Sequence, residues 1–286
     1  RGSSPPKEHK VCINLSGGFR NGMEIMLTGL DIEEKANVFT NTLFNSVGGK
    51  EQFDEVSIQL HRTDKDNANT NEEAMASLVI SVKSKDPNLV GRLFSAKIIE
   101  LALANIPGFF AQSGVKTSGP VIVYWPALVK SKYIKEIVHV DGKDIEVEPT
   151  SQLNLEEIYY QKEPVKLEKI EIKGERELYF GELFGTRSGD KGGCANLGVW
   201  AKNSQAFAFL YDFLTVDKLK DLLPDLQEFK IERFELANIN SLNFYIHDIL
   251  QDGVSSNNKK DGQAKSLGEY LRSKKIKVPE SIIGDL

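Results

Sequence analysis

A short segment, residues 185–200 with the sequence GTRSGDKGGCANLGVW, concentrates residue types that can bind an anion. Its glycines permit tight turns and close backbone approach, and successive backbone N–H groups in such a loop can form a concave anion site. Arg187 can hold a carboxylate or phosphate through two parallel hydrogen bonds, and Lys191 adds a point charge. Asp190 can orient either cation or, if desolvated, accept a proton.

The segment fits two interpretations, a ligand site and a plain hairpin loop. In the first, Asp190 and Lys191 are the catalytic candidates. The binding candidates within the segment are Arg187, Ser188, Gly189, Gly192 and Asn196. In the second, the charges are solvated and form a local salt bridge that adds little stability. The spacing is not that of a Walker loop, and a strand pattern follows where a dinucleotide-binding glycine motif would open a helix.

Composition narrows the function classes. The chain has 286 residues, of which 40% are hydrophobic and 27% charged, an ordinary globular mixture that suggests about two domains. The formal net charge of -5 argues against a nucleic-acid partner, which needs a concentrated basic surface. No apolar run approaches the roughly 20 residues that span a bilayer, so no membrane partner is expected.

The cysteines and histidines add two further expectations. Cys12 and Cys194 are far apart and form no motif, which suits the cytoplasm or another reducing intracellular compartment. The four histidines show no metal-ligand spacing, so no metal site is expected. The chain begins with Arg1 instead of Met, which indicates processing or a fragment of a longer parent.

Hydrophobic periodicity predicts the elements of the first half. They are a hairpin of strands 9–17 and 23–29 around a turn at 18–22, a helix over 30–49, strands over 53–62 and 74–84, a helix over 86–108 and a strand over 120–129. Asp31 with Glu34 three residues later predicts a capping box at the first helix. Residues 131–177 predict a connector with a small hairpin at Asp141–Gly142, ending in a linker.

The second half repeats the same order of elements. The pattern predicts strands over 178–186 and 194–202, a helical stretch over 204–226, strands over 229–236 and 241–250, and a helix over 264–275. Thr215 is expected to cap the second of two helical pieces. Each half therefore predicts β-β-α-β-β-α, an α+β class with two antiparallel-sheet α/β sandwich domains. The predicted division is 1–130, a connector over 131–177, and 178–286.

Three stretches resemble a known family. They are GTRSGDKGGCANLGVWAK, RFELANINSLNFYIHDIL and GQAKSLGEYLRSKKIKVPE, and they are similar to the C-terminal domain of the acyclic terpene utilisation protein A (AtuA-like) family. Members of that family carry the corresponding motifs A-R-S-G-D-K-G-x-x-A-N-I-G-V, E-L-P-N-x-x-A-L-N-F and L-G-E-W-L. RGSSPP, GFRNG and LTGLDIEEKA resemble the family's R-G-x-P-x-P, G-Y-R-D-G and Y-A-G-x-x-A-x-x-R-A. Arg20 matches there, which makes it a further binding candidate, while Asn21 replaces the usual Asp.

The resemblance implies a ferredoxin-like fold for residues 178–286 and identifies the chain as the C-terminal portion of a family member. A further α/β segment of the parent would then precede residue 1. The family is named for growth on acyclic terpenoids, and its members often lie beside enzymes that handle acyl-CoA. The resemblance carries over no established catalytic residue.

Two functions follow as hypotheses. The first is a protein of acyclic terpenoid or acyl-CoA catabolism that binds an anionic small molecule at 185–196, with coenzyme A as part of the substrate. Asn238 and Asn240 are further candidates for this site, or they cap a turn. The second is a non-catalytic fragment that serves oligomerisation or partner docking, since exposed strand edges suit a homo-oligomer.

Overall fold

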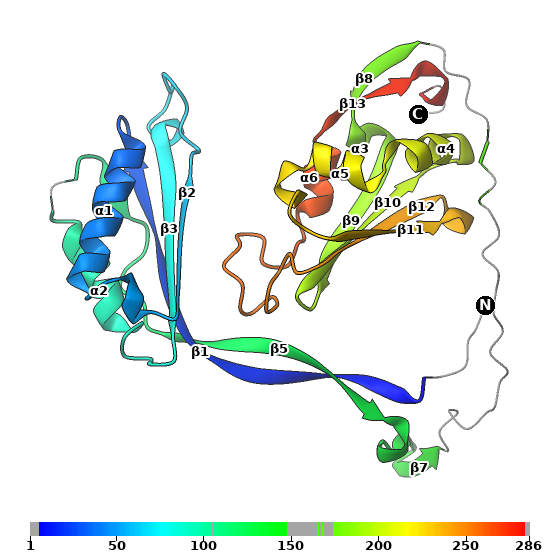
Figure 1. Ribbon diagram of the computed structural model, residues 1–286, viewed down its shortest axis with the longest axis horizontal. Coiled ribbons are helices and arrows are strands. Elements are labelled where there is room, and N and C mark those ends of the chain that lie inside the picture. The colour runs from blue at the N-terminus through cyan, green and yellow to red at the C-terminus, as the bar shows by residue number, and fades with distance from the viewer. Residues whose placement is uncertain (1–5, 105, 148–164, 166, 169–173, 284–286) are drawn as a thin grey trace. The chain divides into compact units, whose positions relative to one another are not determined.

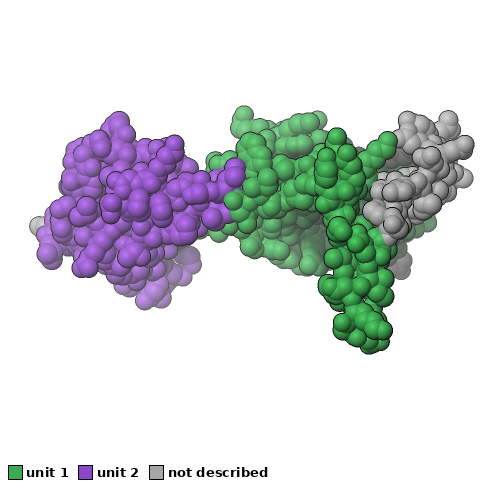
Figure 2. Space-filling view, turned by 90° about the horizontal axis from the view of Figure 1, so that it is seen from below, with its two compact units in different colours: residues 1–14, 124–286 green, residues 15–123 purple. Residues whose placement is uncertain are grey.

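The computed structural model describes residues 6–104, 106–147, 165, 167–168 and 174–283. The chain divides into two compact units, residues 15–123 and residues 1–14 with 124–286, coloured separately in Figure 2. The predicted α+β class is confirmed, because each unit combines antiparallel strand pairs with helices. The division into 1–130, 131–177 and 178–286 stays a prediction.

The unit of residues 15–123 has a sheet of order β2-β3-β1-β4, with β5 also pairing β1. Its elements are β1 (Glu8–Thr28), α1 (Ile32–Ser46), β2 (Glu55–His61), β3 (Met75–Ser84), α2 (Arg92–Leu101), β4 (Phe109–Ala111) and β5 (Gly119–Lys130), of which β1 and β5 continue into the other unit. Phe39 from α1 and Phe94 from α2 pack with Ile25 and Leu78 of the sheet in one core. Both helices therefore cover the same face.

The hairpin predicted around residues 18–22 is wrong, because β1 runs unbroken from Glu8 to Thr28. The turn-forming residues serve close packing here instead. The side chain of Asn21 is buried and donates hydrogen bonds to the carbonyl oxygens of Gly91 at 3.2 Å and Lys116 at 3.1 Å. A Cβ on Gly22 would lie 2.7 Å from the Ile80 carbonyl oxygen of β3, so a glycine lets the two strands approach.

Two further local predictions concern the start of α1 and the hairpin at Asp141–Gly142. Asp31 precedes α1, as predicted, but its side chain makes no capping hydrogen bond. The hairpin at Asp141–Gly142 is confirmed, with both residues at positive φ between β6 (Glu136–Val140) and β7 (Lys143–Val147). Most of the predicted linker that follows lies outside the described residues.

The second unit contains a sheet of order β11-β12-β10-β9 and a separate β13-β8 pair. Its elements beyond the β6–β7 hairpin are β8 (Glu175–Tyr179), α3 (Phe180–Leu183), β9 (Phe184–Lys191), β10 (Cys194–Ala201), α4 (Ser204–Phe213), α5 (Val216–Leu222), β11 (Ile231–Leu236), β12 (Ser241–Ile246), α6 (Leu267–Arg272) and β13 (Lys275–Pro279). The helix α3 interrupts the strand predicted over 178–186. Thr215 caps α5 as predicted, since its hydroxyl accepts from the Lys218 N–H at 3.1 Å.

The helices of this unit lie on one side of the β11-β12-β10-β9 sheet (Figure 1). Every second residue of β10 and β12 enters the core beneath them, including Leu197, Val199, Leu242 and Phe244, each 0% exposed. Burying one such side chain stabilises the fold by roughly 1.5–3 kcal/mol. Because strand side chains alternate between faces, the residues between them point to the opposite, helix-free face.

The segment predicted to be a loop is mostly paired strand. Residues 184–191 form β9 and residues 194–201 form β10, and the turn consists of Gly192 and Gly193 alone. Gly192 has φ +68°, and a Cβ on Gly193 would lie 2.1 Å from the Gln251 carbonyl oxygen. The Leu250 N–H donates to the Gly193 carbonyl oxygen at 2.8 Å, so the turn is packed against the chain after β12. The turn is therefore shorter than the predicted loop, and the anion site of its N–H groups stays a prediction.

We predict that Gly193→Ala destabilises this unit by roughly 1–3 kcal/mol, because the new methyl group has no room beside a backbone oxygen. Gly189→Ala is the matched control, since a Cβ there meets only the flexible Lys265 Nζ at 3.7 Å. Chemical denaturation followed by circular dichroism measures both. Equal stability of the two variants would contradict the packing assigned to the turn.

Candidate functional site

The helix-free face of the β11-β12-β10-β9 sheet, called the open face below, carries the polar groups available for chemistry. Strand register arranges its residues in cross-strand rows. The rows are Gly185–Trp200–Ser241–Leu236, Arg187–Gly198–Asn243–Phe234 and Gly189–Asn196–Tyr245–Glu232. A further row starts with the Lys191–Cys194 pair and continues to His247, whose N–H donates to the Lys230 carbonyl oxygen at 3.0 Å.

A cationic edge runs along β9. Arg187 is exposed on the open face, and neither it nor the Lys265 ammonium forms a salt bridge with any residue that the structure describes. Lys265 precedes α6, yet its Nζ lies 3.7 Å from the position that a Cβ on Gly189 would take. The ammonium therefore reaches around the edge strand and lies beside the empty side-chain position of Gly189. Two cations without a salt bridge to any described residue thus flank one gap in the face.

An amide pair borders this gap. The Asn196 side-chain Nδ2 donates to Asn243 Oδ1 at 3.2 Å across neighbouring strands. Gly189 and Gly198 lie next to Asn196 and Arg187 in the register and add no side chain above the sheet. The amide groups and the two cations therefore surround a low patch of the sheet without glycine side chains, an arrangement that can receive a carboxylate or phosphate.

Apolar side chains occupy the other end of the open face. Trp200, Phe234 and Leu236 are 44%, 47% and 41% exposed. The Trp200 ring lies flat against the Gly185 backbone, because a Cβ on Gly185 would be 2.2 Å from its ring. A ligand with an anionic group at Arg187 could therefore lay a hydrocarbon part on these side chains.

A line of titratable groups crosses β10, β12 and β11 beside Asn196. His247 Nε2 lies 2.7 Å from a Glu232 carboxylate oxygen. The Tyr245 and His247 rings are perpendicular, with their centroids 4.9 Å apart. Cys194 accepts the Asp248 N–H at 3.5 Å and also hydrogen bonds with Tyr245. These residues and Lys265 were not among the predicted site residues, although the alternation of Tyr245 and His247 in FYIHD and of Glu232 in IERFE was a readable signal.

The environment shifts the pKa values of Glu232 and Tyr245 in this line. The hydrogen bonds from His247 and Lys230 lower the pKa of Glu232, so its carboxyl is ionised at neutral pH. The hydrogen bond with Cys194, burial, and the nearby negative charges raise the pKa of Tyr245 to about 12. Tyr245 is therefore a neutral hydroxyl at physiological pH and acts as a hydrogen-bond donor.

Several predicted site residues face the helices and not the open face. Ser188 is 8% exposed, and its Oγ accepts the Gly268 N–H of α6 at 3.0 Å. Asp190 shares this side by strand alternation, which separates it from its predicted partner Lys191. The Lys191 ammonium donates to the Asp190 carbonyl oxygen at 2.8 Å. The structure thus brings Arg187, Gly189 and Asn196 together on one face and does not bring Ser188 or Asp190 to them.

The remaining predicted residues lie elsewhere. Gly192 forms the turn, where a Cβ would lie 2.8 Å from the Tyr124 ring. Asn238 and Asn240 lie between β11 and β12, and the Asn240 carbonyl oxygen accepts the Ala201 N–H at 3.0 Å. Ala201 is at the opposite end of β10 from the turn, roughly 24 Å away along the strand. Arg20 belongs to β1 within the other compact unit.

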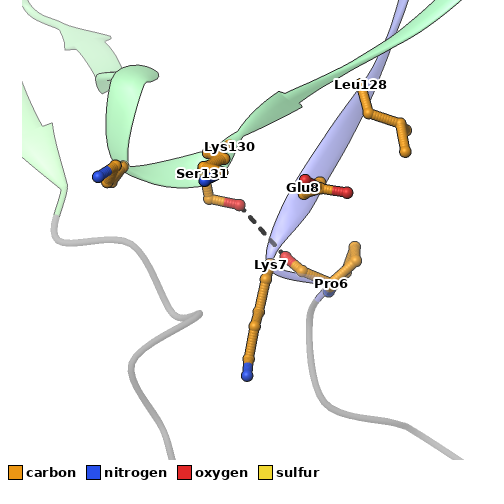
Figure 3. Close-up of a pocket in the computed structure, with 7 residues that line it drawn as sticks. Pro6, Lys7, Glu8, Leu128, Lys130 and Ser131 are labelled. Carbon is orange, nitrogen blue, oxygen red and sulfur yellow. Dashed lines mark hydrogen bonds between the residues drawn. The ribbon is translucent and has the colours of Figure 1, made fainter.

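One other hollow carries positive charge. It has a volume of about 790 Å³ and is lined by Pro6, Lys7, Glu8, Leu128, Lys130, Ser131 and Lys132. The Ser131 hydroxyl donates to the Pro6 carbonyl oxygen at 3.2 Å, and the labelled Lys7 side chain points away from Ser131 (Figure 3). Because its three lysines are exposed and the Lys132 ammonium lies over the Tyr133 ring at 5.0 Å, this hollow offers less for a ligand than the open face.

Metal-binding clusters and membrane-spanning helices are both absent from the described part of the chain. No three His, Cys, Asp or Glu side chains within it come together as a metal site would require. Within the same residues, no helix is long and apolar enough to cross a membrane.

Fold and site together define an α+β protein whose C-terminal sheet presents one helix-free face with cationic, amide and aromatic groups. Residues 1–140 match the family model described as acyclic terpene utilisation family protein AtuA, and residues 180–277 match the AtuA ferredoxin-like domain. The chain belongs to the AtuA family of acyclic terpene utilisation. The sequence led us to expect only the C-terminal portion of a family member, whereas the match also includes residues 1–140. Comparisons with curated proteins and with solved structures found no match.

We predict that Ser188→Ala destabilises the second unit by roughly 1–3 kcal/mol, because the buried Gly268 N–H loses its acceptor. Ser255→Ala, at an exposed turn position, is the matched control and should change stability by less than roughly 0.5 kcal/mol. Urea denaturation measures both. A Ser188→Ala variant as stable as the parent would show that the hydroxyl does not hold α6.

We predict that Cys194→Ala moves the Tyr245 pKa from about 12 back toward its ordinary value of 10.0, because the first cause of the shift is removed. Nuclear magnetic resonance (NMR) of ring-labelled tyrosine between pH 9 and 11 follows the titration, and Tyr245→Phe assigns the signal. Cys12→Ala is the control and should leave it unchanged. An identical titration in Cys194→Ala would refute the hydrogen bond.

Proposed function

We propose that the open face binds an amphipathic anion of acyclic terpenoid catabolism, either a terpenoid carboxylate or the coenzyme A thioester of such an acid. Family membership supports the metabolic setting. The observation that carries the proposal is the pair of cations, Arg187 and Lys265, which form no salt bridge with a described residue and lie beside the empty position at Gly189.

The roles of the residues follow from their places on the face. Arg187 forms the bidentate contact with the anion, and Lys265 supplies the second positive charge. The Asn196–Asn243 amides complete the hydrogen bonds. Trp200 and Phe234 cover an apolar part of the ligand, which is the hydrocarbon chain of a free terpenoid carboxylate or the adenine base of a coenzyme A thioester whose acyl chain runs the other way. Because the cations are exposed to solvent, their attraction for the ligand is screened by salt and affinity falls as ionic strength rises.

A second candidate function rests on the same exposed aromatic surface. Trp200, Phe234, Leu236 and Ile239 together expose apolar area of a kind that often marks protein contacts. The face could therefore join two copies of the chain, as the homo-oligomer hypothesis requires. In that case Arg187 would pair with a carboxylate of the other copy, and sedimentation of Arg187→Ala would show a loss of the oligomer.

We predict that Arg187→Ala weakens binding of geranic acid and of isovaleryl coenzyme A by roughly 10- to 100-fold, the effect of losing a hydrogen bond to a charged group. Isothermal titration calorimetry measures both dissociation constants. Arg176→Ala, an exposed arginine of β8 in the same unit, is the matched control and should bind as the parent does. Equal affinity of Arg187→Ala and the parent for both ligands would overturn the proposed function.

A further inference from the structure

The line of Glu232, His247 and Tyr245 has the geometry of an acid–base unit. The Glu232 carboxylate accepts a hydrogen bond from His247 Nε2 at 2.7 Å, which places the proton of the neutral imidazole on Nε2. Nδ1 is then the free lone pair, able to accept a proton. The perpendicular Tyr245 ring, 4.9 Å away, restricts how the imidazole can turn.

This line is accessible from the open face. The side chains of His247 and Glu232 are 27% and 44% exposed. Tyr245 lies directly opposite Asn196 in the strand register, and Asn196 borders the anion site. A ligand held by Arg187 and Lys265 can therefore extend over Asn196 to reach the imidazole and the phenol without entering the core.

The separation of the two sites restricts the ligand. With roughly 3.4 Å per residue along a strand and roughly 4.8 Å between strands, the Cα atoms of Arg187 and Tyr245 lie about 12 Å apart. In a free carboxylic acid the carbonyl is part of the anionic group. Such a ligand cannot place its negative charge at Arg187 and its carbonyl at Tyr245. The ligand therefore needs an anionic group and a separate acyl carbonyl at opposite ends of a flexible chain.

We propose that His247 and Tyr245 are catalytic residues that transfer a proton at the carbon next to the acyl carbonyl of such a ligand, with Glu232 as the positioning residue. This inference rests on the proposed function, because the anion site must hold the ligand. His247 Nδ1 takes the proton, and the electron pair of the C–H bond moves to the carbonyl oxygen. Tyr245 donates a hydrogen bond to that oxygen. Return of a proton from His247 to the carbon regenerates the acyl group.

Glu232 acts through the imidazole. Its negative charge favours the imidazolium that forms when His247 takes the proton, and its hydrogen bond keeps Nδ1 directed away from β11. Tyr245 can donate because its hydroxyl is un-ionised at neutral pH, and the sulfur that it contacts is a weak acceptor that a ligand oxygen can replace. The titratable and charged groups around His247 are Lys230, Glu232, Tyr245, Asp248 and Cys194.

Exchange of hydrogen for deuterium tests the proposal with isovaleryl coenzyme A as the probe. In D₂O the chain should replace the two protons next to the thioester carbonyl, seen by NMR as loss of their signal. His247→Gln should lower the exchange rate at least about 100-fold while the dissociation constant from calorimetry stays within threefold. Tyr245→Phe should lower the rate about 100-fold. His139→Gln is the matched control, since His139 also contacts a carboxylate, Asp144, on the exposed β6–β7 hairpin.

The outcomes separate the two proposals. Binding of isovaleryl coenzyme A without exchange above the protein-free rate overturns the catalytic assignment and leaves the proposed function standing. Absence of binding overturns both. Glu232→Gln should lower the exchange rate roughly 10-fold at an unchanged dissociation constant, because the imidazole loses the hydrogen bond that orients it, and Glu232→Asp should recover part of the rate. A rate that falls equally in both Glu232 variants, together with a loss of stability in both, would make Glu232 only a structural residue.

Discussion

The alternation of side chains along β10 and β12 is the constraint on which the site depends. Leu197, Val199, Leu242 and Phe244 are completely buried beneath the helices, so the register of the sheet cannot slip by one residue without moving them into water. The residues between them are thereby fixed on the opposite face. The same rule places Asn196, Asn243 and Tyr245 in neighbouring positions on two adjacent rows, although none of them contributes to the core.

The alternation also explains how one face of the sheet can stabilise the fold while the other keeps polar and aromatic groups exposed. Helices α4, α5 and α6 satisfy the apolar side of the sheet, so the open face is free to keep cations, amides and aromatic rings exposed. Glycine at 189 and 198 lowers the surface beside Arg187, and Lys265 adds a charge from the segment before α6. The glycines of the turn have a different role, since Gly193 gives room to the backbone after β12.

Much of the fold could be predicted from the sequence, because periodicity reports burial directly. The paired helices around Thr215 and the hairpin at Asp141–Gly142 follow from local signals and were confirmed. The unbroken β1 could not be predicted, since Gly22 and Asn21 resemble a turn until their neighbours across the sheet are known. Of the residues in the proposed site, Arg187 and Asn196 could be singled out from the sequence, whereas Lys265 and His247 reach the same face from distant segments. Ser188 and Asp190 were misplaced because a loop was expected where strand alternation applies.

The two tryptophans of the chain provide the most direct test of whether the open face receives the ligand. Trp200 lies on that face, whereas Trp125 lies on β5. The measurement is the two-dimensional NMR spectrum of the two indole N–H groups during titration with isovaleryl coenzyme A, assigned with Trp125→Phe. Our account predicts that the Trp200 signal shifts in a saturable way while the Trp125 signal stays in place. Saturable binding that moves only Trp125, or neither signal, would contradict it.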